Sequence, residues 1–179
     1  MAKVTTRTGD QGYTGLLGSE RVPKYDPRIE ALGLLDESTS ALGLARATAT
    51  DERVRTLILG WQQMLYRLMA EVAATPDTIS KLQIARVSEG DVAALEQTTE
   101  DLKREVEISN RFIIPGETLS GAALDLARTI VRRAERHVAR MVHVGDVANP
   151  EVLRYLNRLS DTLFVLARYV ERGHSREVC

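Results

Sequence analysis

The chain has 179 residues, 44% of them hydrophobic and 27% charged, which is typical of one globular domain with a substantial core. Only 4% are aromatic, so the core must consist mainly of Leu, Val, Ile and Ala, and this favours packed helices over a sheet sandwich. Lys and Arg number 24 and Asp and Glu number 25, for a formal net charge of -1. This balance excludes a general polyanion-binding protein, so any anion site has to be local.

The sequence shows no feature of secretion or membrane insertion. It has no apolar run as long as a signal peptide or a transmembrane helix, and its first residues lack a hydrophobic segment. The single cysteine, Cys179, excludes an intrachain disulfide and a cysteine-based metal site. We therefore expect a cytoplasmic protein that does not associate with a membrane.

The first half of the chain predicts a loop followed by two helices. Residues 1–25 are rich in Gly, Thr and charged side chains, which is typical of a loop. Asp26-Pro27 is a typical helix start, with Asp as the N-cap and Pro at the first helical position. From there the apolar spacing predicts a helix to about residue 48, and a second helix is predicted over residues 52–74.

The second half predicts three more helices. Ser88 and Asp91 resemble a capping box, which predicts a helix from there through Val106. A fourth helix is predicted over residues 117–144, and Pro150 marks the first turn of the last one. No segment predicts a strand, so we expect an all-α bundle of about five helices with a long ordered N-terminal loop. A loop of that length in a compact domain usually serves binding.

The predicted fourth helix is unusually rich in arginine. At about 100° per residue, Arg128, Arg132 and Glu135 fall on one narrow stripe. The opposite stripe, expected to face the core, comprises Leu119, Ala123, Leu126, Ile130, Ala134 and Met141. Apolar side chains also flank the charged stripe, at Leu124, Val131 and Val142. Two interpretations stay open: a binding site or interface, and an exposed i, i+4 charge network.

The N-terminal loop has the composition of a phosphate-binding segment. Its glycines, which can turn backbone N–H groups toward a ligand, are Gly9, Gly12, Gly15 and Gly18. Its hydroxyl donors and positive charges are Thr6, Thr8, Thr14, Arg7 and Lys24. No Gly-Lys-Ser/Thr follows the glycines, so the segment is not a P-loop. A polyphosphate cradle and a disordered or merely packed tail both remain open.

Three further residues carry alternatives. Asp36 either faces water or pairs with an Arg of another helix or subunit. Asn157 is a structural amide, a phosphate contact or a cation ligand, and Phe112, in a loop, is a core plug or part of a ligand pocket. A di-iron centre in a helical bundle is excluded, because Glu135 is followed by His137 at +2 instead of the +3 that such sites use.

Three separate segments, in the same order, resemble the PduO-type ATP:cob(I)alamin adenosyltransferases over nearly the whole chain. They are Thr6-Arg-Thr-Gly-Asp-Gln-Gly-Tyr-Thr-Gly-Leu, Phe112-Ile-Ile-Pro-Gly with Ala127-Arg-Thr-Ile-Val-Arg-Arg-Ala-Glu-Arg, and Tyr155-Leu-Asn-Arg-Leu-Ser-Asp-Thr-Leu-Phe-Val-Leu-Ala-Arg. The resemblance implies a ferritin-like five-helix bundle that assembles as a homotrimer with active sites between subunits. It also implies transfer of the 5′-deoxyadenosyl group of ATP to the cobalt of cob(I)alamin, giving adenosylcobalamin and triphosphate.

The same resemblance implies roles for individual residues. Residues 1–25 would form a nucleotide-binding loop on a single-domain bundle of residues 26–179. The ATP-binding residues of that loop would be Thr6, Arg7, Thr8, Gly9, Asp10, Gly12, Thr14 and Lys24. Arg132, Glu135 and Asn157 would complete the nucleotide site. Mg²⁺ is expected with ATP, held mainly by the phosphates, and its protein ligands are not identified.

The resemblance assigns the remaining residues to the corrinoid side of the reaction. Arg128 would pair with Asp36 of a neighbouring subunit, and Phe112 would cover the lower face of the corrin and exclude the axial ligand. Ser38-Thr39 stands where the family usually has Leu-Asn, which makes subunit packing near Asp36 less predictable. A corrinoid reductase and an adenosylcobalamin-dependent client enzyme are the implied protein partners.

Two other functions compete with this one. A nucleotide-binding bundle without transferase activity would keep Arg132 and the N-terminal loop but tolerate the loss of Phe112. A nucleic-acid binder using the Arg-rich helix is disfavoured by the balanced charge and the lack of interleaved aromatic residues. Arg133 and Arg136 point away from the main stripe, and we assign them to surface or interface pairs.

Overall fold

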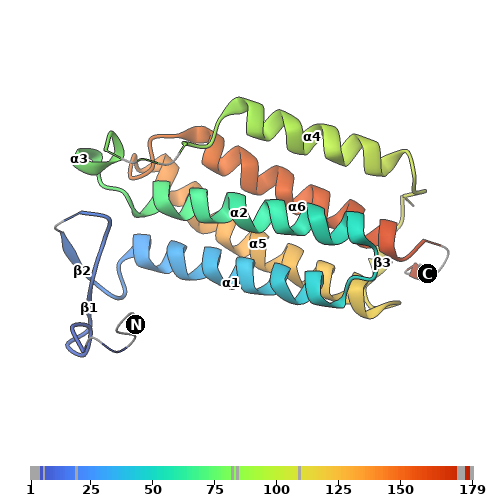
Figure 1. The fold of residues 1–179 in the computed structure, drawn as a ribbon, viewed down its shortest axis with the longest axis horizontal. Helices are drawn as coiled ribbons and strands as arrows, with labels where there is room; N and C mark the ends of the chain where they lie inside the picture. Colours follow the sequence, from blue (N-terminus) through green and yellow to red (C-terminus); the bar gives the residue numbers. More distant parts are fainter. Residues whose placement is uncertain are drawn as a thin grey trace.

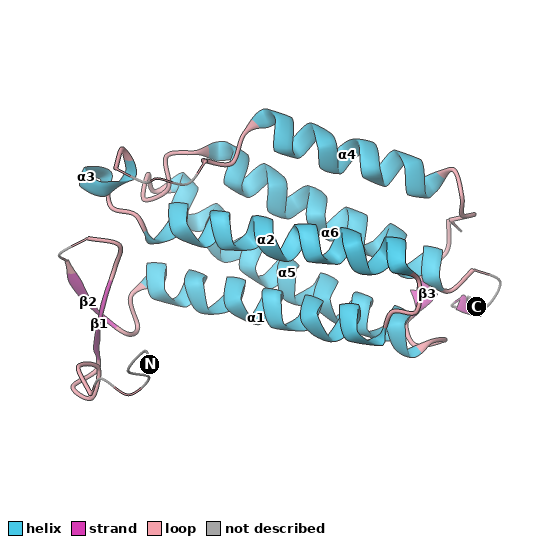
Figure 2. Ribbon diagram, in the orientation of Figure 1, coloured by secondary structure: helices cyan, strands magenta, loops and turns pink. Residues whose placement is uncertain are grey.

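The structure is a computed structural model that describes residues 5, 7–18, 20–81, 83, 85–108, 110–172 and 176–177. Within these residues the chain is mostly helical, which confirms the expected all-α class (Figure 2). The helices are α1 (Pro27–Thr48), α2 (Glu52–Ala73), α3 (Pro76–Ile79), α4 (Glu89–Lys103), α5 (Leu119–His143) and α6 (Pro150–Val170). The strands are β1 (Tyr13–Gly15), β2 (Arg21–Pro23), β3 (Ile113–Ile114) and β4 (Arg176–Glu177).

The long helices run side by side along the longest axis of the molecule (Figure 1). Helix α1 packs against α2 and α5, α5 packs against α6, and α6 packs against α4. Strands β1 and β2, which form an N-terminal hairpin, lie beyond one end of the bundle, where α1 begins, and β3 lies at the other end (Figure 1). This order places α5 between α1 and α6, so its side chains can contact both neighbours.

The predicted caps explain why the helices begin where they do. The Asp26 side chain accepts a hydrogen bond from the backbone N–H of Arg28 at 2.8 Å, as an N-cap does. Ser88 and Asp91 form the predicted capping box at the start of α4. Burial raises the pKa of the Asp91 carboxyl, but hydrogen bonds from Ser88 and Arg67 outweigh burial and hold that pKa below its ordinary value.

The face that α5 turns to the core differs from the one expected. Leu119 and Leu126 are 74% and 51% exposed, so the predicted core stripe is wrong at these two positions. The buried apolar side chains of α5 are Ala123, Leu124, Ala127, Val131, Ala134, Val138 and Met141. Because Leu124 and Val131 belong to this face, the neighbouring Arg128 lies at the edge of the core and not opposite it.

The chain forms short strands where the sequence predicted none. Strands β1 and β2 pair antiparallel with Thr14 opposite Val22, so the expected N-terminal loop contains a small hairpin. The hairpin is joined to the bundle near Leu17, whose N–H donates to Ala73 O at 3.2 Å and whose carbonyl accepts from the Thr78 hydroxyl at 2.8 Å. Strands of two or three residues are too short to show the alternation of apolar and polar side chains by which a strand is predicted.

The unusual Ser38-Thr39 pair of α1 lies inside the bundle. Both residues are buried, and their hydroxyls donate to the carbonyls of Leu34 and Leu35 at 2.8 and 3.1 Å.

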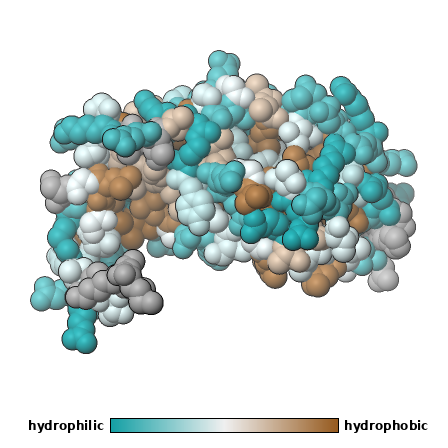
Figure 3. Space-filling view, viewed as in Figure 1, coloured by the Kyte–Doolittle hydropathy of each residue, from teal (hydrophilic) through white to brown (hydrophobic). Residues whose placement is uncertain are grey.

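Hydrophilic residues cover much of the face shown in Figure 3, while hydrophobic ones gather toward the end that carries the hairpin. None of the helices among the described residues is long and apolar enough to cross a membrane.

Candidate functional site

The charged stripe predicted on α5 is present, and its members differ in environment. The Arg128 side chain is 26% exposed and ion-paired, whereas Arg132 is exposed. The Arg132 guanidinium has no hydrogen-bond or ion-pair partner within the described part of the chain. Glu135, one turn further, is half-buried and bonded to α6. The stripe therefore presents one unpaired cation between two anchored side chains.

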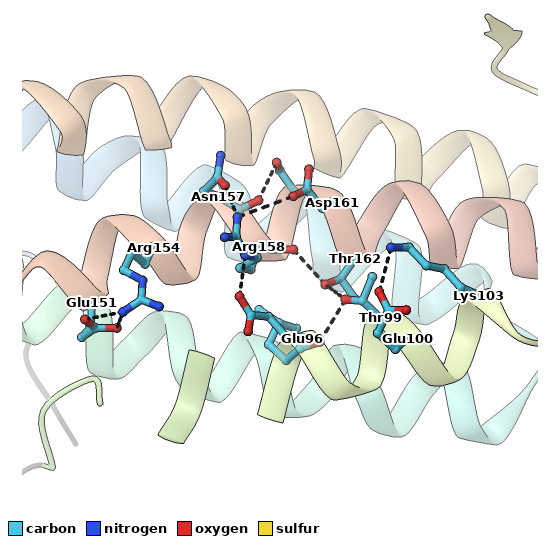
Figure 4. A network of polar contacts seen from close by, with 12 residues as sticks. Glu96, Thr99, Glu100, Lys103, Glu151, Arg154, Asn157, Arg158, Asp161 and Thr162 are labelled. Carbon is cyan, nitrogen blue, oxygen red and sulfur yellow. Dashed lines mark hydrogen bonds and ion pairs between the residues drawn. The ribbon is translucent and has the colours of Figure 1, made fainter. Parts of the chain in front are cut away.

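Asn157 of α6 connects Glu135 to a network that reaches α4. Its amide Nδ2 donates to Glu135 Oε1 at 2.8 Å, and its Oδ1 accepts from Arg158 at 2.6 Å. Arg158 also donates to Glu96 of α4 at 2.7 Å (Figure 4). Because Arg158 can only donate, the amide oxygen must face it and the amide nitrogen must face Glu135. The orientation of the Asn157 amide is thus set by hydrogen bonds to two side chains, Glu135 and Arg158, and not by hydrogen bonds to the backbone.

Phe112 lies on the surface at the rim of a cavity. Its side chain is 85% exposed, so the core-plug interpretation is wrong and the ligand-pocket interpretation is favoured. A cavity of about 430 Å³ is lined by Asn110, Arg111, Phe112, Ile113, Arg128 and Phe164. We call it the Phe112 cavity. Its lining combines exposed aromatic surface with a guanidinium, as expected for a large ligand that is apolar in part.

A cluster of buried charges behind this cavity escaped the sequence analysis. Asp125 accepts from Arg128 Nε at 3.0 Å and from Arg168 Nη2 at 2.5 Å, and Arg168 also donates to Glu171 at 2.8 Å. The only available signal was a charge inside an apolar run, since Asp125 is flanked by Leu124 and Leu126. Phe164 and Arg158 likewise belong to the third family motif, which begins at Tyr155, but the sequence assigned no role to them.

The N-terminal candidates gather around the β1–β2 hairpin. Arg21 donates to the carbonyls of Thr8 and Tyr13 at 2.7 and 3.2 Å, which closes the turn before β1. Lys24 lies over Gly9, because a Cβ at Gly9 would meet Lys24 Nζ at 3.1 Å. Gly12 has a φ of +81°, and its carbonyl accepts from the Lys24 N–H at 2.8 Å. The segment therefore brings a lysine next to a glycine-rich turn, as the phosphate-cradle hypothesis requires.

The other N-terminal candidates are spread over the same segment. Arg7, with a φ of +61°, and Asp10 are exposed, and Thr14 is half-buried in β1. Thr6 lies outside the described residues. In one chain this segment lies beyond the end of the bundle, whereas Arg132 is near the middle of α5 (Figure 1). The structure thus brings the predicted site residues together in two groups and does not join the two groups.

Asp36 is exposed on α1, away from any Arg partner in the described part of its own chain. The neighbouring carboxylate, Glu37, pairs instead with Arg133 of α5, so Arg133 forms one of the surface pairs assigned to it. Arg136 donates to the Arg132 carbonyl at 3.0 Å. Within the chain, Arg128 is paired with Asp125 and leaves Asp36 available to another molecule.

Comparison with known proteins identifies the family. Residues 4–170 match the family model described as cobalamin adenosyltransferase. The chain is 39% identical over 171 residues to a corrinoid adenosyltransferase of Citrobacter freundii, and the match covers 96% of both proteins. It is 41% identical over 165 residues to the corrinoid adenosyltransferase PduO of Salmonella typhimurium, covering 92% of this chain and 48% of the relative. The chain therefore spans about half the length of that relative.

A solved structure agrees with this match. It is a phenylalanine-to-histidine variant of the PduO-type ATP:corrinoid adenosyltransferase from Lactobacillus reuteri, complexed with cobalamin and ATP. The two chains are 29% identical and superpose with a TM-score of 0.87, over 99% of this chain and 100% of the other. Motifs, fold and family model agree over almost the whole sequence, and the chain belongs to the cobalamin adenosyltransferase family.

Proposed function

We propose that the chain transfers the 5′-deoxyadenosyl group of ATP to the cobalt of a reduced corrinoid. The Co(I) centre supplies the electron pair that forms the Co–C5′ bond, and the C5′–O bond breaks with triphosphate as the leaving group. The substrate is itself a strong nucleophile, so the protein needs no Ser or Cys nucleophile. Its task is to position two substrates and to stabilise the negative charge that develops on triphosphate.

The observation that carries this proposal is the arrangement of Arg128 and Arg132 along α5. Arg128 lines the Phe112 cavity, which suits the face of a corrin ring. Arg132 lies one turn further along the same helix with its guanidinium unpaired among the described residues, which suits a phosphate. One helix thus presents a corrinoid contact and a leaving-group contact about 6 Å apart along its axis, since four residues span that rise.

The nucleotide site has a second part in this proposal. The glycine-rich turn with Lys24 would bind the triphosphate, together with the hydroxyls of Thr6, Thr8 and Thr14, and Asp10 would belong to the same ATP-binding loop. Glu135 and Asn157 would contact the nucleoside. Mg²⁺ would enter with ATP and be held mainly by its phosphates, the way Mg²⁺ is usually bound at nucleotide sites.

The proposal includes a homotrimer, because the two groups of site residues are separate in one chain. The N-terminal segment of one subunit would close over the Arg132 region of the next, and exposed Asp36 would reach Arg128 of a neighbour. A ferritin-like five-helix arrangement, a cytoplasmic location, a corrinoid reductase and an adenosylcobalamin-dependent client belong to the same proposal. Sedimentation equilibrium tests the assembly, and a monomer that remains active would contradict it.

The first experiment is an anaerobic assay with ATP, Mg²⁺ and chemically reduced cob(I)alamin, followed through the corrin absorption spectrum. We expect ATP-dependent formation of a photolabile alkylcobalamin. The Arg132→Ala variant should lose at least about a hundredfold in kcat, because a donor to the leaving group acts mainly in the transition state. Tight ATP binding without any conversion by the unaltered protein would overturn the transferase proposal in favour of a non-catalytic nucleotide binder.

A further inference from the structure

The buried charges between α5 and α6 form a balanced cluster behind the Phe112 cavity. The side chains of Arg168, Asp125 and Glu171 are 3%, 4% and 0% exposed. A buried ion is costly unless its partners are close and well oriented. Two carboxylates, from Asp125 and Glu171, here face two guanidinium groups, from Arg168 and Arg128. The cluster is therefore neutral overall, and each member depends on the others.

The two oxygens of Asp125 have different partners. Oδ2 accepts from Arg168 Nη2 at 2.5 Å, and Oδ1 accepts from Arg128 Nε at 3.0 Å. Because Arg128 is bound only through Nε, its two terminal nitrogens have no hydrogen-bond partner in the portion of the chain that the structure describes. Asp125 thus fixes the direction of the Arg128 side chain without occupying the end that a ligand or a second subunit would contact.

Arg168 contacts a second wall of the same cavity. Its guanidinium lies 5.4 Å from the ring centroid of Phe164, within the range of a cation–π interaction. Phe164 and Arg128 both line the Phe112 cavity. Arg168 therefore supports two lining residues, one through Asp125 and one directly.

Glu171 joins the cluster to the start of α5 through a hydrogen bond. Its Oε1 accepts from the Thr118 N–H at 3.2 Å, and its Oε2 accepts from Arg168 at 2.8 Å. The carboxylate fills the space beside Gly121, where a Cβ would lie only 2.1 Å from Oε1. The absence of a side chain at Gly121 is what makes room for Glu171, so the cluster is a specific feature of this packing.

We propose that Asp125, held by Arg168, is a positioning residue for Arg128 in the corrinoid cavity. Asp125 does not touch the substrate; it acts by holding the Arg128 guanidinium at the angle needed to contact the corrinoid or Asp36 of a neighbour. This inference rests on the proposed function and deepens it. The competing explanation is that the cluster only ties α5 to α6.

The first test compares Asp125→Asn with Glu71→Gln. Glu71 is also a buried carboxylate with an Arg partner, Arg86, but it lies on α2 away from the cavity lining. We expect Asp125→Asn to raise the corrinoid KM about tenfold and to leave the ATP Kd within twofold, as loss of a charged hydrogen bond predicts. Glu71→Gln should lower Tm without changing the corrinoid KM. Equal corrinoid KM values in Asp125→Asn and the unaltered protein would overturn the proposal.

The second test asks whether Asp125 acts through Arg128. In an Arg128→Ala background, adding Asp125→Asn should change the corrinoid KM by less than twofold, because the side chain it positions is already absent. An undiminished tenfold effect in that background would show a purely structural role. If Asp125→Asn does not yield folded protein, Arg168→Lys gives the same comparison, because it keeps the charge but its shorter side chain cannot place a donor where Arg168 Nη2 contacts Asp125 and Glu171.

A third measurement does not depend on catalysis. The Arg128 Nε–H signal, assigned in nitrogen NMR spectra by its absence from Arg128→Lys, should exchange slowly with water and become fast in Asp125→Asn. Rapid exchange in the unaltered protein would contradict the positioning role. Slow exchange in a protein that converts no cob(I)alamin would sustain the positioning of Arg128 while overturning the transferase proposal, so the two failures are distinguishable.

Discussion

The N-terminal hairpin and the α5–α6 region both contain predicted site residues, but they hold them in different ways. In the α5–α6 region, Arg128 is bonded to Asp125, and Asn157 is bonded to both Glu135 and Arg158. In the hairpin, backbone hydrogen bonds and the Arg21 side chain contribute to the order. The helical part of the site is thus organised in the single chain, whereas the hairpin lies beyond the end of the bundle and is joined to it near Leu17.

This difference indicates that the two regions have different roles, one ordered before binding and the other adjusting during it. The two residues of the Phe112 cavity that lie on helices, Arg128 and Phe164, are held by neighbouring side chains before any ligand binds, which lowers the entropic cost of ordering them. The N-terminal hairpin, which we propose binds ATP, would instead adjust to ATP and to a second subunit. If that is correct, changes in the α5–α6 region should alter both stability and activity, and changes in the hairpin should alter activity alone.

The largest effect is expected for Gly121→Ala. The new Cβ would lie 2.1 Å from Glu171 Oε1, so the buried carboxylate must leave Arg168 and the Thr118 N–H. Displacing a buried charge from its partners should cost about 3 kcal/mol of unfolding free energy. Urea titration measures this directly, and the corrinoid KM should rise in the same variant.

The matched control is Gly60→Ala on α2. Gly60 is exposed, and a Cβ there would meet nothing within 4 Å. The free energy of unfolding of this variant should rise by about 0.5 to 1 kcal/mol, since Ala has a higher helix propensity than Gly. A Gly121→Ala protein as stable as this control would show that Glu171 moves easily and that the α5–α6 region is not rigid.

Next in size is Phe112→Ala. The exposed ring contributes little to the free chain, so stability should change by less than about 0.5 kcal/mol. Covering the ring with a corrinoid buries a large apolar area, and its loss should weaken the corrinoid interaction by about 2 kcal/mol, roughly thirtyfold in KM. ATP binding, measured by calorimetry, should be unchanged. A parallel loss of ATP affinity would mean that the Phe112 cavity and the nucleotide site are not separate.

Much of the fold could be predicted from the sequence, because its determinants are local. Asp26 and Ser88 mark helix starts through hydrogen bonds to residues two or three positions away. The Arg168–Asp125 pair could not be predicted, since its partners are 43 residues apart and meet only when α5 packs on α6. The exposed Leu126 was misassigned for a related reason: equal helical periodicity is compatible with several faces, and packing selects one.

The candidate site shows the same limit. The types of its residues, Arg132, Glu135 and Asn157 among them, followed from the recognised motifs. Their geometry did not, because the direction of the Asn157 amide depends on Arg158 and, through it, on Glu96 of a different helix. The motifs therefore predicted which side chains form the site, and packing determined which of them are held in place.

Arg158→Ala tests whether that network supports the nucleotide site. Without Arg158 the Asn157 amide can turn, and Glu135 loses a fixed donor. We expect ATP Kd to rise about tenfold, corresponding to the loss of one hydrogen bond to a charged group. Arg154→Ala is the control, because Arg154 lies one turn earlier on α6 and, among the described residues, pairs with Glu151 and not with Asn157. If the two variants bound ATP equally well, the network would serve only to join α4 to α6 and would not support the nucleotide site.

The smallest effect, and the sharpest test of the comparison, is expected for Gly12→Ala. Gly12 has a φ of +81°, which costs an L-residue about 1 kcal/mol, and its carbonyl accepts from the Lys24 N–H. The strain should weaken ATP binding about fivefold by shifting Lys24, yet Tm should not change, because the hairpin can loosen while the bundle stays folded. Gly15→Ala is the control, since a Cβ at Gly15 meets nothing within 4 Å and its φ lies outside the left-handed region. If Gly12→Ala lowered Tm as well, the hairpin would be part of the cooperative unit, and the contrast between a fixed corrinoid half and an adjustable nucleotide half would be wrong.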